Sequence, residues 1–89
     1  MNEQKHLVYI LQCGDETLYT GYTNDLSRRL QMHEQGKGAK YTRGRGPFQV
    51  VYVNYFPTKS EAMQHEYYVK QLTRDKKLLL IAEKERDDL

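Results

Sequence analysis

Two runs of branched and aromatic residues near the start of the chain, separated by a short turn, place the strongest constraint on the fold. The runs span residues 6–13 (HLVYILQC) and 17–23 (TLYTGYT), and residues 14–16 (GDE) lie between them. This pattern predicts two β-strands joined as a hairpin. Successive side chains of a strand point to opposite faces, and in the first run both sets are largely apolar. We therefore expect a sheet that is covered on both sides, or on one side and by a cleft on the other.

Length and composition limit the classes of protein to which the chain can belong. A chain of 89 residues cannot divide its apolar residues between two stable cores, so one domain over residues 1–89 is expected. With 38% hydrophobic and 29% charged residues, the chain is expected to fold. No apolar run approaches the roughly 20 residues of a membrane helix, and the first residues lack a signal-peptide pattern. These features predict a soluble, cytoplasmic protein with no membrane partner.

The cysteine and histidine content argues against structural zinc. Cys13 is the single cysteine, which excludes an intramolecular disulfide and a cysteine-rich zinc site. The three histidines, His6, His33 and His65, do not have the spacing of metal ligands.

A helix is predicted over residues 25–35. Asn24 is a good N-cap, and Gly36 stands where a helix commonly ends. Steps of 100° per residue place Leu26 and Leu30 at the centre of the buried face.

Two side chains on the edge of that helix are candidates to line a cleft. Arg29 and His33 are one turn apart, at the boundary between core and solvent, whereas Arg28 is expected to point to water. Taken alone, His33 is more often a residue that bonds a carbonyl at a helix end than a catalyst.

The second half of the chain predicts one strand followed by two helices. Residues 48–56 (FQVVYVNYF) form the strongest strand pattern in the chain. Thr58 and Glu61 have the spacing of a capping box, which predicts the start of a second helix. A break at residues 73–75 predicts a third helix, in which residues 78–81 (LLLI) are expected to be buried.

Positive charge is concentrated in one segment. Residues 28–45 hold six basic residues and one acidic residue, a net charge of +5, whereas the rest of the chain has a net charge of −3. A concentrated basic patch is typical of a surface that binds a polyanion, although a solvated loop that serves solubility is the alternative. The glycine-rich part of this segment contains the candidate nucleic-acid contacts Lys37, Lys40, Arg43 and Arg45.

Glu66 is out of place on the second predicted helix. It lies in the apolar sector with Ala62 and Val69. A buried carboxylate is costly unless it is paired, hydrogen-bonded or bound to a cation. The alternative, an exposed pair with Lys70 one turn on, is equally consistent with the helical positions.

Two tyrosines and a glycine in the hairpin suggest a site. Tyr9 and Tyr19 lie near the middles of the two strands and can face the same side, although a packing role is the ordinary one for each. Gly21 weakens a strand and often marks the close approach of a ligand or of another backbone. Together with Arg29, His33 and Glu66, these residues supply a base, a cation ligand and a positive group, which phosphodiester hydrolysis requires.

The spacing of these residues resembles the GIY-YIG nuclease family. Its two motifs correspond to Leu7-Val8-Tyr9 and Tyr19-Thr20-Gly21, Arg29 follows Gly21 by eight residues, and His33 follows four later. The similarity continues through residues 38–43 and 46–48 to Glu66, and is greatest to small stand-alone bacterial members related to the Slx-type endonucleases. It covers nearly the whole chain.

The resemblance implies an α/β (α+β) fold and a set of roles. The fold is a three-stranded antiparallel sheet flanked by helices, in the order β-β-α-β-α-α. Tyr9 would take a proton from the attacking water, Tyr19 would orient that water, Arg29 would stabilise the phosphate, His33 would contact the phosphate or a tyrosine, and Glu66 would bind one divalent metal, Mg²⁺ or Mn²⁺. Arg29 and the metal are expected to favour the Tyr9 phenolate, because an unperturbed tyrosine has a pKa of about 10.

The resemblance also implies DNA as the partner, with branched or structured DNA among the candidate substrates. The protein is otherwise expected to be a monomer, or to be targeted by a larger protein partner. The family has an asparagine after the metal-binding glutamate, whereas this chain has none after Glu66. Gln71 and Thr73 are the candidates to replace it. The alternative function is a nucleic-acid-binding module that kept the fold and lost efficient hydrolysis.

Overall fold

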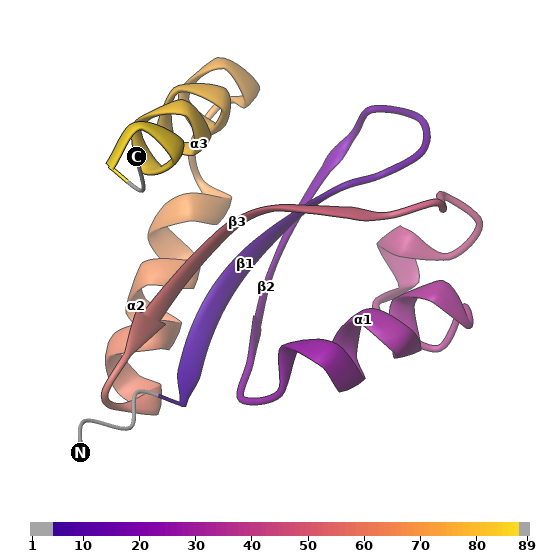
Figure 1. Ribbon diagram of the computed structural model, residues 1–89, viewed down its shortest axis with the longest axis horizontal. Coiled ribbons are helices and arrows are strands. Elements are labelled where there is room, and N and C mark those ends of the chain that lie inside the picture. Colours follow the sequence, from indigo (N-terminus) through magenta and orange to yellow (C-terminus); the bar gives the residue numbers. More distant parts are fainter. Residues whose placement is uncertain (1–4, 88–89) are drawn as a thin grey trace.

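The computed structural model describes residues 5–87 and has the expected order of strands and helices (Figure 1). The elements are β1 (His6–Gln12), β2 (Leu18–Thr23), α1 (Leu26–Glu34), a short 3₁₀ helix η1 (Lys40–Thr42), β3 (Gln49–Phe56), α2 (Lys59–Lys70) and α3 (Arg74–Asp87). Only η1 was not expected from the sequence, and it lies within the glycine-rich basic segment.

The three strands form one antiparallel sheet with the order β2-β1-β3. The predicted hairpin pairs β1 with β2, and β3 pairs with the other edge of β1. A register shift between Ile10 and Leu11 marks a β-bulge against β3. The central position of β1 explains why both of its faces are apolar, since both are covered by other elements.

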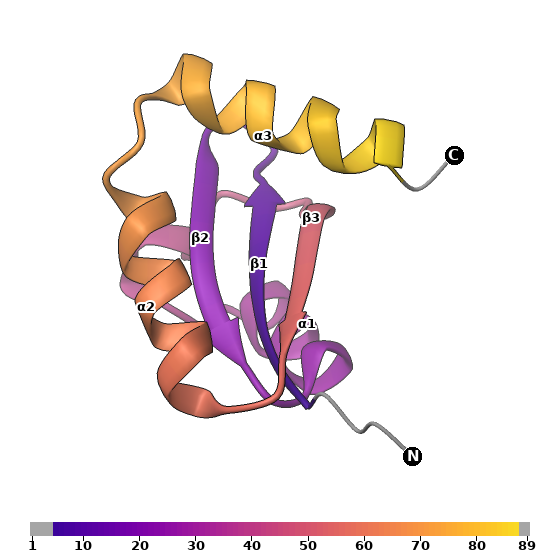
Figure 2. The same ribbon diagram turned by 90° about the vertical axis from the view of Figure 1, so that its left-hand side faces the viewer.

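Helices cover both faces of the sheet, as Figures 1 and 2 show. On one face, Leu7, Tyr9 and Leu11 pack against side chains of α1 and of the segment that leads into β3. On the other face, Val8 and Ile10 pack against α2 and α3. Because α1 and α2 lie on opposite sides of the sheet, residues from both can meet only around an edge strand. Figure 2 shows α2 beside β2 at such an edge.

The helix starts follow the expected capping chemistry with one correction. The N-cap of α1 is Asp25, whose carboxylate accepts a hydrogen bond from the backbone N–H of Arg28 at 3.1 Å, and not Asn24 as the sequence suggested. Asp25 has the extended backbone of an N-cap, which moves the start of the helix by one residue. At α2 the prediction is confirmed, because the hydroxyl of Thr58 accepts from the backbone N–H of Glu61 at 3.2 Å.

The expected burial of residues 78–81 is only half right. Ile81 is buried and Leu80 is half-buried, but Leu78 and Leu79 are 42% and 57% exposed. An α-helix has 3.6 residues per turn, so four consecutive side chains cannot all face the sheet. None of the helices within residues 5–87 is long and apolar enough to cross a membrane.

Candidate active site

The hairpin register brings the two tyrosines to the same face of the sheet. Tyr9 lies opposite Gly21, and Tyr19 lies opposite Leu11, two pairs further along. The two phenol rings are 6.3 Å apart between centroids. A Cβ at Gly21 would lie 2.5 Å from the Tyr9 hydroxyl oxygen. Gly21 therefore makes room for the Tyr9 side chain, and it is this tyrosine that occupies the space that the sequence suggested for a ligand or another backbone.

The Tyr9 hydroxyl is the start of a buried hydrogen-bond chain. Its oxygen lies 2.8 Å from Nε2 of His33, and Nδ1 of His33 lies 2.7 Å from the hydroxyl oxygen of Thr42. The Thr42 hydroxyl donates to the carbonyl of Ala39 at 2.9 Å. All three side chains are about 1% exposed.

This chain of hydrogen bonds fixes which nitrogen of His33 carries the proton. A hydroxyl has one proton, and that of Thr42 is given to Ala39, so Thr42 accepts from His33. The Nδ1 atom of His33 therefore carries the proton, and Nε2 of the neutral ring accepts the proton of Tyr9 in a hydrogen bond.

The electrostatics around Tyr9 differ from the expectation. Burial, together with the neighbouring Tyr19, raises the pKa of Tyr9; the positive charge of Arg29 opposes this rise and the negative charge of Glu66 adds to it. The expectation that Arg29 favours the phenolate is right in sign, but desolvation is the larger effect. Burial, and then the charge of Arg29, lower the pKa of His33, which keeps its imidazole neutral, so that Nε2 can accept the hydrogen bond from Tyr9.

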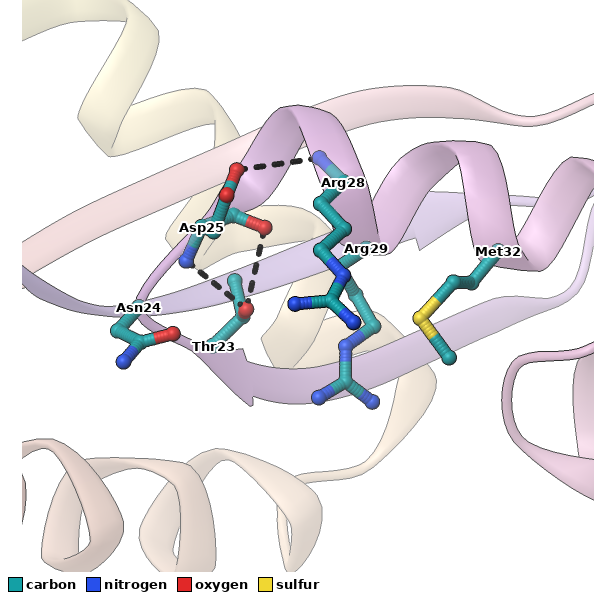
Figure 3. A pocket seen from close by; sticks show the side chains of 6 residues that line it. All are labelled: Thr23, Asn24, Asp25, Arg28, Arg29 and Met32. Atoms are coloured by element: carbon teal, nitrogen blue, oxygen red, sulfur yellow. Dashed lines mark hydrogen bonds between the residues drawn. The ribbon is translucent and has the colours of Figure 1, made fainter.

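Arg29 also lines an open pocket of about 240 Å³ at the start of α1. In Figure 3 the guanidinium groups of Arg28 and Arg29 both lie between Asn24 and Met32. Arg29 is half-buried and Arg28 is exposed, as expected. None of the ion pairs within residues 5–87 involves either arginine, so both guanidinium groups are available to an anion.

Glu66 combines the two alternatives that the sequence left open. Its side chain is only 14% exposed, and it also forms an ion pair with Lys70 at 3.4 Å. Its negative charge adds to the raised pKa of both Tyr9 and Tyr19, so Glu66 lies within electrostatic reach of the two tyrosines. Within residues 5–87 there is no group of three or more side chains of the metal-binding types. A single carboxylate nevertheless fits Mg²⁺, which is often held by one or two carboxylates, with water and phosphate oxygens as its other ligands.

Gln71 and Thr73 are the candidates to replace the asparagine that the family has after its metal-binding glutamate. The Thr73 hydroxyl accepts a hydrogen bond from the backbone N–H of Lys76 at 3.3 Å and so caps α3. Gln71 is exposed at the C-cap of α2. The structure therefore does not identify a replacement among them.

The four basic residues of the loop differ in their surroundings. Lys37, Lys40 and Arg43 are exposed. Arg45 forms an ion pair with Asp15 at 2.5 Å, donates to the carbonyl of Tyr41 at 2.7 Å and lies over the Tyr41 ring. Arg45 thus connects the loop to the hairpin turn, a structural role that the sequence did not predict.

Sequence reasoning missed Thr42 and Gly38. A Cβ at Gly38 would collide with the ring of His33, so the glycine lets the loop pass close over the imidazole. Both residues lie in the segment that supports the family resemblance, but nothing local to this segment shows that it folds over His33.

A comparison with known protein families shows to which family the chain belongs. Residues 5–78 match the family described as the GIY-YIG catalytic domain. The chain belongs to the GIY-YIG family. The predicted three-stranded fold and the family resemblance are therefore both confirmed. Membership supports an endonuclease-like function on a nucleic-acid substrate, and GIY-YIG nucleases generally use divalent metals.

Similar proteins occur in several bacteria. UPF0213 protein OB0043 of Oceanobacillus iheyensis is 65% identical over 96% of this chain and 99% of its own. The solution NMR structure of UPF0213 protein BH0048 from Bacillus halodurans is 58% identical, with a TM-score of 0.58 over 86% of this chain and 82% of that one. The solution NMR structure of EF2693 from E. faecalis is 40% identical, with a TM-score of 0.59 over 89% and 85% of the two chains. These names state no activity, and the narrower resemblance to the Slx type stays a prediction.

Proposed function

We propose that this GIY-YIG protein is a metal-dependent endonuclease that hydrolyses phosphodiester bonds in DNA. The observation that carries the proposal is the buried chain of hydrogen bonds from Tyr9 through His33 to Thr42, and the charges of Arg29 and Glu66, which act on Tyr9, support it. A purely structural tyrosine needs only one hydrogen-bond partner. It does not require that this partner, His33, has a fixed tautomer, or that Arg29 is unpaired and Glu66 mostly buried nearby.

Tyr9 and His33 act together as the base. The attacking water gives its proton to the Tyr9 oxygen as the Tyr9 proton moves to Nε2 of His33. This two-proton transfer avoids a free phenolate, whose formation burial disfavours. The water oxygen bonds to phosphorus and the bond to the leaving oxygen breaks, with the leaving oxygen taking a proton from solvent. His33 then returns its proton to Tyr9 as Tyr9 releases a proton to solvent.

Arg29 and Tyr19 position and stabilise the phosphate. The guanidinium of Arg29 faces an open pocket and would hold the phosphate oxygens as negative charge develops on them. Tyr19 has its ring 5.4 Å from that of His33 between centroids, and would orient the water. A divalent metal, Mg²⁺ or Mn²⁺, bound by Glu66 would neutralise the phosphate oxygens.

The proposal is tested with Tyr9→Phe and Glu66→Gln, assayed on branched and single-stranded DNA with Mg²⁺ or Mn²⁺. Tyr9→Phe is expected to lower cleavage by about 10²- to 10⁴-fold, because it removes the proton relay and leaves the ring in place. Glu66→Gln is expected to reduce cleavage to background with little change in DNA binding, because an amide is a far weaker ligand for a hard cation.

Glu61→Gln is the matched control on the same helix. Glu61 lies in the first turn of α2 and is exposed, so its loss is expected to change stability by less than about 1 kcal/mol and to leave cleavage unchanged. Cleavage that survives Tyr9→Phe, or that is lost in Glu61→Gln and kept in Glu66→Gln, would contradict the assigned site.

A nucleic-acid-binding module without efficient hydrolysis is the second candidate. The raised pKa of Tyr9 and the lack of an asparagine after Glu66 favour it. It predicts that wild-type protein binds DNA and gives the same background cleavage as Tyr9→Phe, a result that would replace the first proposal.

A further inference from the structure

A second concave surface runs along the outer edge of β2, beside the end of α2 and the first turns of α3. It consists of two adjoining pockets of about 320 and 190 Å³, which share Leu18, Tyr41 and Lys77. We call it the β2–α3 groove, and its lining includes Leu18, Tyr41, Lys70, Arg74 and Lys77.

The charge of the β2–α3 groove has one sign. Lys70 comes from α2, and Arg74 and Lys77 come from α3. Among the described residues that line it, none is acidic. None of the ion pairs within residues 5–87 includes Arg74 or Lys77. Burial and the nearby charge of Lys70 both lower the pKa of Lys77, so two ammonium groups are held near each other in a partly desolvated place. Such an arrangement favours a bound anion.

A buried polar group points to a ligand independently of the charges. Thr20 lines the larger of the two pockets and is 3% exposed. Its hydroxyl has no hydrogen-bond partner among the described residues. Buried hydroxyl groups are normally paired, because an unmade hydrogen bond costs free energy. An oxygen-rich ligand, or water that it orders, would supply the partner.

The β2–α3 groove is continuous with the candidate active site. Tyr19 lines the groove and also lies in the site, and Lys70 forms the ion pair with Glu66. Burial raises the pKa of Tyr19, and the charge of Lys70 opposes this rise. A strand whose phosphate lies at Arg29 and Tyr19 would therefore extend along the groove.

We propose that the β2–α3 groove binds the sugar–phosphate backbone of the DNA strand beyond the scissile bond, with Lys70, Arg74 and Lys77 each facing a phosphate. The inference rests on the proposed function, because continuity with the nuclease site is what selects a nucleic acid over an acidic protein segment. It adds a binding surface at the outer edge of β2, apart from the basic side chains of the loop.

The experiment measures binding of a fluorescein-labelled single-stranded oligonucleotide by anisotropy, in EDTA, over a range of salt concentrations. Arg74→Ala/Lys77→Ala is expected to weaken binding roughly tenfold at low salt and to reduce the salt slope by about 1.4, because each phosphate contact on a single strand contributes about 0.7. The matched control, Lys76→Ala/Arg86→Ala, removes the same charge from exposed positions of α3 and is expected to keep the wild-type slope.

The outcomes separate the groove from the nuclease activity. Equal losses of affinity in the two double variants, at equal melting temperatures, would reveal a general charge effect and overturn the groove. A groove variant that keeps DNA binding and loses binding of a poly-glutamate peptide would also overturn it, in favour of an acidic protein partner. A reduced salt slope with no cleavage by the wild type would contradict only the nuclease proposal. An unchanged slope, with cleavage that depends on Tyr9, would contradict only the groove.

Discussion

At the scale of single residues, the surroundings of a side chain decide its chemistry here. Tyr9 is an ordinary strand residue by sequence, but burial raises its pKa and His33 accepts its proton in a hydrogen bond. His33 acts as an acceptor because Thr42 holds the proton of the ring on Nδ1. The predicted catalytic pair thus depends on a threonine whose importance no local pattern shows.

Replacing Thr42 tests this dependence. Thr42→Val leaves Nδ1 of His33 and the carbonyl of Ala39 without their partner, and is expected to cost about 1–3 kcal/mol of stability. It should also lower kcat with little change in KM, because the ring is then free to carry its proton on Nε2. Thr42→Ser is expected to restore both. Long-range ¹⁵N–¹H NMR spectra of the imidazole report the tautomer directly, and a wild-type ring protonated on Nε2 would contradict the assignment.

At the scale of elements, the segment between α1 and β3 combines two functions. Gly38 and Thr42 fold it over His33, and Arg45 fastens it to the hairpin turn through Asp15. The basic side chains of the segment that stay exposed, Lys37, Lys40 and Arg43, are those available to phosphates. The net charge of the segment therefore overstates its capacity to bind nucleic acid, because part of that charge is used within the protein.

The two roles of the loop are separable by mutation. Arg45→Ala is expected to lower the melting temperature by a few degrees, because a hydrogen bond and a cation–π contact together contribute roughly 1 kcal/mol, and to keep the salt slope of DNA binding. The triple variant Lys37→Ala/Lys40→Ala/Arg43→Ala should keep the melting temperature and reduce the slope, by up to about 2.7 on duplex DNA. If Arg45→Ala lowers the slope by as much per residue as the triple variant, Arg45 contacts phosphate as the sequence suggested.

At the scale of the whole molecule, each face of the sheet contains a histidine whose pKa is lowered by burial, the buried His33 on one face and the half-buried His65 on the other. His33 lies on the α1 face. On the other face, Nε2 of His65 in α2 is hydrogen-bonded to the hydroxyl of Tyr52 at 2.8 Å. Burial lowers the pKa of both histidines. The stability of the molecule as a whole is therefore linked to pH through both layers.

Acid is expected to destabilise the fold below about pH 6.5. Unfolded histidine has a pKa of about 6.5, so the unfolded chain binds protons that the folded His33 and His65 resist. The free energy of unfolding should be level near pH 7.5 and fall as the pH drops below 6.5, at up to about 1.4 kcal/mol per pH unit for each histidine. Urea unfolding at a series of pH values measures this slope.

His65→Gln is expected to reduce that slope by about half. Asp15 does not contribute in this window, because hydrogen bonds from Thr17 lower its pKa below 3.8. Stability that stays constant, or rises, between pH 6.5 and 5.5 would contradict the assignment of lowered pKa values to His33 and His65.

The sequence by itself determined the order of strands and helices, the hairpin and the spacing of the motifs. These depend on alternation, capping and turn residues, which act over a few neighbours in the chain. Only the tertiary structure decided that desolvation outweighs Arg29 at Tyr9, that Arg45 pairs with Asp15, and that Leu79 is exposed. Only the tertiary structure also decided that Thr42, in the loop after α1, is a hydrogen-bond partner of His33. Burial and pairing depend on which segments meet in space, and no local pattern contains that information.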